Sequence, residues 1–450
     1  MSHLSFFGGV EEVTGSNYLL EHKDKKILID CGMFQGSRFA EEKNFEPFPY
    51  NPKKIDFLAI THSHIDHIGR IPKLYREGFR GKIFSTRPIK DFAELFLSDS
   101  LKQLEDIARD FKKEPFFDEK DLIGAMNLFE TYDYGEKIDL GENFYLIFRD
   151  AGHILGSSII EVFINGQKLA FTGDLGNPPT PILKPTERIS NADWLIMEAT
   201  YGNRLHEDKL KRKTLLERAI EDTVTQGGVL MIPAFAMERT QEILYELDEL
   251  VKNHRIPRIP IFIDSPLAIK ATNIYKKYTD YYNQEAISLI RSGEDFFRFS
   301  GLKFTETKEE SKKINDVPAP KIIIAGSGMS NGGRILHHER RYLADPKSLL
   351  LIIGYQAFGS LGRRLLDGEK EVRLFGETIP VRARVRAIGG YSAHADQEGL
   401  LEFVSNMRET LKKVFLVHGE FGAAETLALK IKDEMAIEAI IPKFGEKFEI

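Results

Sequence analysis

Residues 61–67 carry three histidines and one aspartate, and these residue types at this spacing are suited to binding a metal ion. His62, His64 and His67 supply imidazole nitrogens, which bind zinc, iron, nickel and copper well. Asp66 adds a carboxylate, which suits a hard or borderline divalent cation. The chain has 12 histidines among 450 residues, so three within six positions are not expected by chance. The segment therefore predicts a divalent metal site, and a histidine-rich surface loop is the weaker interpretation.

Four more candidate residues share one format, because each follows a short apolar run and lies beside glycine. They are His153, Asp174, His394 and His418. Taken singly, each would more often be an ordinary loop or core residue. The apolar runs have the length of strands, and loops that follow buried strands often present functional groups. The shared format predicts that these side chains converge at one edge of a sheet.

A glycine-rich stretch at residues 325–334 leads from an apolar run toward an expected helix. Its glycines would let backbone N–H groups approach an anion, and Ser327, Ser330 and Arg334 could add donors. The stretch lacks the Gly-Lys-Ser/Thr of the nucleotide P-loop. An anion-binding loop and a tight structural turn are equally good interpretations of this pattern on its own.

Composition restricts the class of protein. A chain of 450 residues with 42% hydrophobic and 29% charged residues is typical of a globular protein with two domains. No apolar run is long enough to span a membrane, and residues 1–12 do not resemble a signal peptide. The single cysteine, Cys31, excludes an internal disulfide and favours the cytoplasm. Any metal site must therefore use histidine and carboxylate ligands.

The expected elements change in character after residue 200. Before it, short strands follow one another, Asn165-Gly166 predicts a hairpin turn, and helices are expected at 89–110 and 118–129. After it, helices alternate with strands, which predicts a parallel sheet covered by helices. The expected helices are 210–226, 239–253 and 331–343, and the strands are 228–232, 260–264, 321–325 and 348–353. We expect an exposed connection at 303–316 and surface positions for His337 and His338.

The order of the candidate residues resembles the motif series of the metallo-β-lactamase superfamily. That series is matched by Asp30, His62-x-His64-x-Asp66-His67, His153 and Asp174. Glu198, His394 and His418 are similar to three further motifs of the β-CASP branch. The resemblance covers nearly the whole chain and includes residues 233–236, 264–268, 326–329 and 354–363. The branch contains RNA-processing nucleases, including RNase J and the pre-mRNA 3′-end endonuclease.

The resemblance implies an α/β fold, the metallo-β-lactamase αββα sandwich with an inserted β-CASP α/β domain. The first domain would comprise residues 1–200 and be completed by residues 386–450. The β-CASP domain would comprise residues 201–385. An active site between two such domains would admit a single strand more readily than a duplex.

The resemblance also implies two zinc ions. The first ion would be bound by His62, His64, His153 and Asp174. The second would be bound by Asp66, His67, His418 and again Asp174. Asp30 would orient the ligands by hydrogen bonding. Zinc lowers the pKa of a bound water to about 7, and a pair of ions can stabilise both the nucleophile and the phosphate.

The remaining roles are implied in the same way. His394 would act as the general acid, held in position by Glu198, and Asp66 would orient the attacking water. The phosphate and RNA contacts would be Ser327, Gly328, Met329, Ser330, Arg334 and Arg363.

The resemblance therefore implies a cytoplasmic, zinc-dependent ribonuclease that cleaves single-stranded RNA internally. Three alternatives stay open: a 5′-exoribonuclease of the same family, a small-molecule metallo-hydrolase, and a non-catalytic scaffold of RNA processing. The residue pattern does not distinguish internal from terminal cleavage, and it leaves both a homodimer and a monomer open.

Overall fold

The computed structural model describes residues 2–207, 209–354, 356 and 359–450. Three positions of the segment 354–363, Tyr355, Ala357 and Phe358, lie outside these residues. The chain forms two compact units. The first comprises Met1–Pro178, Lys184–Leu205 and His394–Ile450, and the second comprises Pro179–Leu183 and His206–Ala393.

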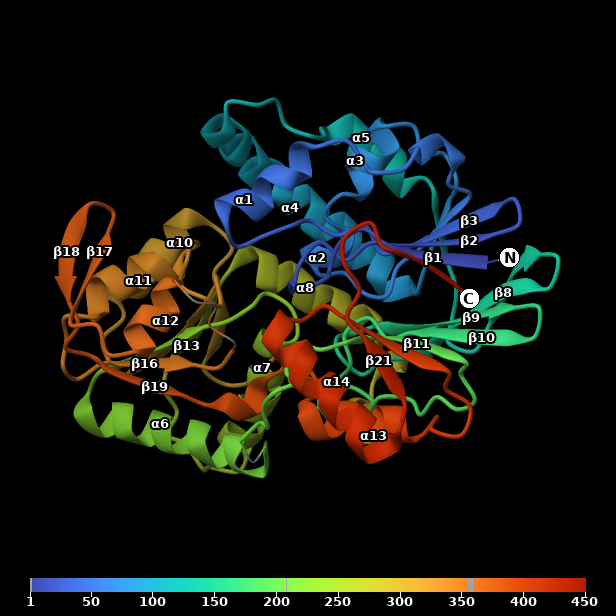
Figure 1. The fold of residues 1–450 in the computed structure, drawn as a ribbon. Helices are drawn as coiled ribbons and strands as arrows, with labels where there is room; N and C mark the ends of the chain where they lie inside the picture. Colours follow the sequence, from blue (N-terminus) through green and yellow to red (C-terminus); the bar gives the residue numbers. More distant parts are fainter. Residues whose placement is uncertain (1, 208, 355, 357–358) are drawn as a thin grey trace. The chain divides into compact units, whose positions relative to one another are not determined.

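Two seven-stranded sheets form the centre of the first unit (Figure 1). One sheet has the order β22-β1-β2-β3-β4-β5-β6, with bounds Lys447–Glu449, Ser2–Phe6, Tyr18–His22, Lys25–Ile29, Phe57–Ala59, Lys82–Ser85 and Phe129–Thr131. The other has the order β21-β20-β11-β10-β9-β8-β7, with bounds Glu438–Ile440, Lys413–Val417, Trp194–Glu198, Gln167–Phe171, Ser158–Ile164, Phe144–Asp150 and Lys137–Gly141. The hairpin predicted at Asn165-Gly166 is confirmed, because Gln167 pairs with Ile164.

The hydrophobic core of this unit lies between the two sheets. The rings of Phe6 and Phe415, one from each sheet, have centroids 5.3 Å apart. On the outer face of the second sheet, Leu195 and Leu416 pack with residues of α13 (Gln397–Ser405) and α14 (Phe421–Met435). Figure 1 shows α3 (Ile71–Arg76), α4 (Arg87–Phe111) and α5 (Glu119–Met126) beside the other sheet. The expected αββα sandwich is confirmed.

The second unit contains one six-stranded sheet in which every pair is parallel, as predicted. Its order is β14-β13-β15-β12-β16-β19, with bounds Leu302–Phe304, Ile261–Asp264, Lys321–Ala325, Val229–Pro233, Leu349–Ile352 and Arg384–Ala387. The helices are α6 (Arg212–Gln226), α7 (Arg239–Lys252), α8 (Pro266–Lys277), α9 (Gln284–Arg291), α10 (Lys308–Lys313), α11 (Ile335–Tyr342) and α12 (Leu361–Leu366). A two-stranded hairpin of β17 (Glu371–Leu374) and β18 (Glu377–Pro380) is added.

Four expectations about local structure were wrong. Helix α11 begins at Ile335 rather than 331, because Ser330 and Gly333 have positive φ angles and form a turn. The helix predicted at 118–129 ends at Met126, and β6 begins at Phe129. Residues 303–316 include most of β14 and all of α10, whose capping box joins Thr307 and Glu310. His338 is buried rather than on the surface. None of the described helices is long and apolar enough to cross a membrane.

Candidate metal centre

The predicted metal-binding residues lie at strand ends of the first unit. His62 and His64 follow β4, and Asp66 and His67 belong to the short helix α2 (Ile65–Ile68). The others follow β8, β10 and β20 in the same manner: His153, Asp174 and His418. Since neighbouring strands β10, β11 and β20 run parallel, their carboxyl ends meet at one edge. The structure thus brings together side chains that are up to 356 positions apart, His62 and His418 being the extremes.

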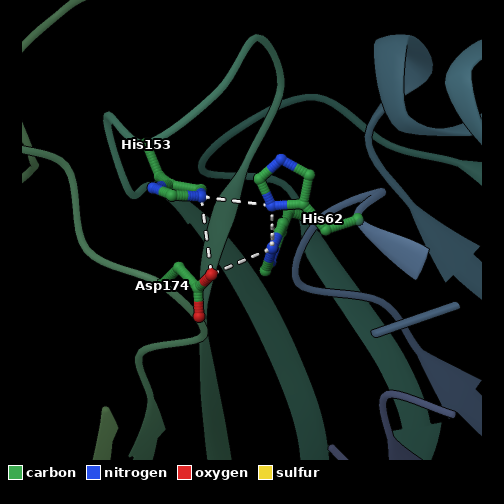
Figure 2. Close-up of side chains that lie close together, drawn as sticks. His62, His153 and Asp174 are labelled. Atoms are coloured by element: carbon green, nitrogen blue, oxygen red, sulfur yellow. Dashed lines mark hydrogen bonds and ion pairs between the residues drawn. The ribbon is translucent and has the colours of Figure 1, made fainter. Parts of the chain in front are cut away.

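One group of four ligand atoms surrounds a point beside Asp174 (Figure 2). His62 Nε2 lies 3.0 Å from His64 Nδ1 and 3.2 Å from Asp174 Oδ2. His153 Nε2 lies 3.4 Å from His64 Nδ1 and 3.4 Å from Asp174 Oδ2. A tetrahedral zinc site with bonds of about 2.0–2.1 Å has ligand atoms about 3.3–3.4 Å apart. The four atoms are therefore spaced as the corners of such a site.

A second group lies on the other side of the same carboxylate and consists of Asp66, His67 and His418. His67 Nε2 is 3.4 Å and His418 Nε2 is 3.6 Å from Asp174 Oδ1. His67 Nε2 and Asp174 Oδ1 are both buried and have no hydrogen-bond partner among the described residues. A buried nitrogen lone pair facing a buried carboxylate oxygen is costly unless a cation lies between them. The donor set thus fits a divalent ion in this group as well.

Asp30 orients the imidazole of His67 by hydrogen bonding. Its side chain is fully buried, and its Oδ1 accepts the Thr61 backbone N–H at 2.8 Å. Its Oδ2 accepts the Thr61 hydroxyl and lies 2.7 Å from His67 Nδ1. When His67 donates its Nδ1 proton to this oxygen, the lone pair at Nε2 points into the second group. Burial raises the pKa of Asp30 to about 7, although the hydrogen bonds from Thr61 oppose this.

The electrostatics favour the metal-binding protonation state at His67, His153 and Asp174 but not at His62 and Asp66. Burial would lower the pKa of His62, but the Asp174 carboxylate outweighs it and raises that pKa, and burial raises the pKa of Asp66. Burial and the neighbouring imidazoles hold the pKa of His67 well below its usual value, and burial is the largest cause of the same shift at His153. Burial would raise the pKa of Asp174, but the imidazoles, led by His418 and His62, hold it well below its usual range. Neutral histidines around an ionised carboxylate are the forms that coordinate a divalent cation.

His394 and Glu198 form a pair at the edge of the first group. His394 Nδ1 lies 2.9 Å from Glu198 Oε2, and Glu198 Oε1 accepts the Leu175 backbone N–H at 2.6 Å. Burial lowers the pKa of His394, but the carboxylates of Glu198 and Asp174 outweigh it and raise the pKa to about 9. Its side chain is 21% exposed, whereas the side chain of Glu198 is fully buried. The arrangement gives an accessible imidazolium with a fixed orientation.

Comparison with known proteins identifies the family. Residues 10–220 match the metallo-β-lactamase superfamily, residues 240–365 match the β-CASP domain, and residues 378–442 match the Zn-dependent metallo-hydrolase RNA specificity domain. A protein named as a ribonuclease in Thermus thermophilus is 40% identical, over 98% of this chain and 98% of that protein. This chain is a β-CASP protein of the metallo-β-lactamase superfamily.

Other β-CASP relatives have different names. An RNase J-like protein of Methanocaldococcus jannaschii is 32% identical over 98% of both chains. A transcription termination factor of Methanosarcina mazei is 33% identical over 96% of this chain and 69% of that protein. A crystal structure of a protein of unknown function from Enterococcus faecalis covers 99% of both chains with a TM-score of 0.57 and 13% identity, which is a likeness of fold alone. Together, the family and the donor set support divalent metal binding by this chain.

The predicted RNA contacts lie in the second unit of this β-CASP protein. Ser327, Gly328, Met329 and Ser330 form the turn between β15 and α11. The Ser330 hydroxyl donates to buried Glu339, and the Arg334 guanidinium donates to Asp264 and to the carbonyls of Thr305 and Glu306. Arg363 donates to Asp367 at 2.9 Å. Ser330, Arg334 and Arg363 thus have internal partners, and Ser327 Oγ accepts the Asn331 backbone N–H at 3.1 Å.

Two residues near the metal centre were missed by the sequence reasoning. Thr61 hydrogen-bonds Asp30 and lies 3.1 Å from His62 Nδ1 through its hydroxyl. Ser16 Oγ lies 3.1 Å from His418 Nδ1, across 402 positions of sequence. Thr61 could have been found, because it precedes the histidine run directly. Ser16 gave no local signal.

Proposed function

We propose that this chain is a zinc-dependent ribonuclease that hydrolyses phosphodiester bonds in single-stranded RNA. The proposal rests on the two groups of ligand atoms that share Asp174, beside the His394–Glu198 pair. Relatives named ribonuclease and RNase J-like protein, and the match to an RNA specificity domain, support RNA as the substrate.

The buried imidazoles and carboxylates would hold two zinc ions. His62, His64 and His153 would bind one, Asp66, His67 and His418 would bind the other, and Asp174 would bridge them. When bound, two zinc ions would supply a hydroxide near neutral pH and neutralise charge on the phosphate. Asp30 and Ser16 would hold two of the imidazoles in the tautomer whose Nε2 lone pair faces inward.

His394 would supply the proton that the departing ribose oxygen needs. Glu198 occupies Nδ1 of this imidazole, which leaves Nε2 as the nitrogen that donates to the leaving group. Burial lowers the pKa of His394, but the carboxylates of Glu198 and Asp174 raise it to about 9, and a general acid must be protonated before it reacts. Asp66 would orient the attacking water. Cleavage at the P–O3′ bond gives products with 3′-hydroxyl and 5′-phosphate ends.

The finer assignments form part of the same proposal. Cleavage is internal, in the cytoplasm, and the metallo-β-lactamase domain comprises residues 1–200 and 386–450 around a β-CASP domain of residues 201–385. Ser327, Gly328, Met329, Ser330, Arg334 and Arg363 contact the RNA backbone. Ser330 and Arg334 also keep the loop in shape through their internal hydrogen bonds.

The test uses purified protein with zinc and two RNAs, one linear with a 5′ label and one circular. Cleavage of the circular RNA requires internal cutting and is the expected result. A 5′-exonuclease would degrade the linear RNA and leave the circle intact. Zinc-loaded protein that cleaves neither RNA would contradict the proposed function, and sedimentation of the same sample distinguishes a homodimer from a monomer.

A further inference from the structure

The first unit contains an aromatic pocket that plays no part in the metal centre. Its cavity volume is about 330 Å³. The apolar lining residues are Phe7, Phe34, Phe39, Pro47, Pro49 and Phe444. We call it the Phe34 pocket, after the ring that is only 2% exposed. Phe39 and Phe444 are 76% and 56% exposed, which is unusual for large apolar side chains that gather at one place.

The buried side of the Phe34 pocket is held rigidly. Asn44 accepts the backbone N–H of Phe34 and donates to its carbonyl, at 2.9 and 2.8 Å. The Arg70 guanidinium carbon lies 4.5 Å from the centroid of the Phe34 ring, and Lys43 Nζ lies 4.9 Å from it. Lys43 also lies 5.6 Å from the centroid of Phe39. A preformed aromatic surface with cations at its side loses little entropy when a flat ligand binds.

The charges around the pocket favour a neutral ligand. Its polar lining residues are two cations and two anions: Lys43, Arg70, Glu42 and Glu46. These charges cancel, and outside the lining Lys43 is paired with Glu12 at 3.1 Å and Glu42 with Lys113 at 3.0 Å. A phosphate or a carboxylate would lie next to two glutamates, whereas a neutral aromatic ring with N–H groups on its edge could use them as acceptors. Nucleobases have this combination of a flat face and a polar edge.

A single stretch of backbone separates the pocket from the metal centre. Gly15 packs on Phe34 so closely that a Cβ at this position would lie 2.4 Å from the ring. The next residue, Ser16, lies 3.1 Å from His418 Nδ1 on the other side. Consecutive Cα atoms are about 3.8 Å apart, so the backbone that packs on Phe34 is one residue from the residue that contacts His418.

We propose that the Phe34 pocket binds one unstacked nucleobase of the RNA strand that is cleaved at the metal centre. The inference rests on the ribonuclease function proposed above. Single-stranded nucleic acids bind aromatic side chains by stacking, and every base has a face that can stack. Glu42 and Glu46 accept hydrogen bonds, so adenine, cytosine and guanine, which carry exocyclic amino groups, bind better than uracil.

The test combines two changes in the protein with single changes in the RNA. Phe39→Ala with Phe444→Ala removes the two exposed rings, and the exposure of both leaves folding intact. Phe375→Ala is the matched control, because this ring is 54% exposed and lies in the second unit. The substrates are short RNAs in which one base at a time, at successive positions around the cut, is removed to leave an abasic ribose. KM and kcat are measured with saturating zinc.

We expect one abasic position to raise KM of the unchanged protein by about 5- to 150-fold, with little effect on kcat. The double variant should show a similarly raised KM for intact RNA and no response to that abasic position. Phe375→Ala should behave like the unchanged protein. At the sensitive position, uracil should give a KM several-fold higher than adenine, cytosine or guanine.

Three results would overturn the inference. If the double variant keeps the original KM and the original response to abasic positions, the base binds elsewhere and only the pocket is refuted. If the substitutions change the number of subunits but not KM, the pocket is an interface between two copies of the chain. If zinc-loaded protein neither binds nor cleaves any of the RNAs, the proposed function fails and the pocket assignment fails with it.

Discussion

Each unit of the molecule contains a buried aspartate surrounded by polar side chains. The two clusters differ in whether both carboxylate oxygens of the aspartate have hydrogen-bond partners. In the second unit, Asp264 Oδ1 accepts Thr305 and Arg334, and Oδ2 accepts Ser311 and lies 2.7 Å from His338 Nε2. Burial opposes ionisation of Asp264, but these hydrogen bonds, led by the one from His338, lower its pKa to about 2. The carboxylate has a partner at each oxygen and a cation in Arg334.

The aspartate of the first unit is contacted by imidazoles rather than by a guanidinium. Asp174 is 2% exposed and faces imidazole nitrogens from both sides, yet its Oδ1 has no hydrogen-bond partner among the described residues. The two clusters use similar residue types. The comparison shows that residue type and burial alone do not identify a ligand site; the two clusters differ in the unsatisfied atoms His67 Nε2 and Asp174 Oδ1. In the Asp264 cluster Arg334 supplies a cation, whereas the imidazoles around Asp174 leave a position that a metal ion would fill.

The largest effect is expected when Asp174 is replaced. Asp174→Asn keeps the shape and removes the charge that both groups share. Zinc content should fall, and kcat should fall on the order of 10³-fold or more, because a metal supplies several kcal/mol of transition-state stabilisation. Metal analysis by atomic emission and initial cleavage rates measure the two quantities. Full zinc content in this variant would refute the shared role of Asp174.

His394→Ala should separate chemistry from metal binding. Zinc content should stay unchanged, while kcat should fall about 10²- to 10⁴-fold because the proton donor is lost. His337→Ala is the matched control, since His337 is an exposed histidine of the second unit. Loss of zinc with cleavage intact is the outcome that this assignment does not allow.

Asp264→Asn should have the opposite pattern. Replacing the carboxylate leaves Arg334 and His338 without their charged partner, which should lower the free energy of unfolding by about 3 kcal/mol. Zinc content should be that of the unchanged protein, because no ligand is touched. Urea unfolding and metal analysis on the same preparation test both statements. If the variant loses zinc but keeps its stability, Asp264 is a metal ligand and the proposed difference between the two clusters is wrong.

Glu339 should show its effect as a dependence of stability on pH. Burial raises its pKa to about 8, against an ordinary value of 4.5, and the hydrogen bond from Ser330 opposes the shift. Between these values the folded chain keeps a proton that the unfolded chain releases. Stability should therefore fall as pH rises through this window, by at most about 1.4 kcal/mol per pH unit. Glu339→Gln should remove that slope, and an unchanged slope in urea unfolding from pH 5 to 8 would contradict it.

The metal centre could be predicted because its residues carry a local signal. Each of His153, Asp174 and His418 follows an apolar run, and parallel strands bring such positions to one edge whatever the intervening sequence does. The parallel sheet of the second unit was predictable for the same reason, since alternating helices and strands allow few other arrangements.

The satisfied cluster could not be predicted in this way. His338 was expected on the surface, because the two-histidine segment looks polar and its partner Asp264 lies 74 positions away. Arg334 was expected to contact RNA, and its hydrogen bond to the same aspartate was not anticipated. Long-range pairing of ordinary polar residues leaves no pattern in the local sequence. The start of α11 was predicted four positions too early. The sequence Asn331-Gly332-Gly333 does not by itself show that Ser330 and Gly333 have the positive φ angles of a turn.

The most direct test of the central claim is anomalous diffraction at the zinc edge from crystals of the metal-loaded protein. Two peaks are expected in the first unit, one among His62, His64 and His153 and one among Asp66, His67 and His418, with Asp174 between them. No peak is expected at Asp264. A single peak away from Asp174, or a peak at Asp264, would contradict the claim that unsatisfied ligand atoms mark the metal centre.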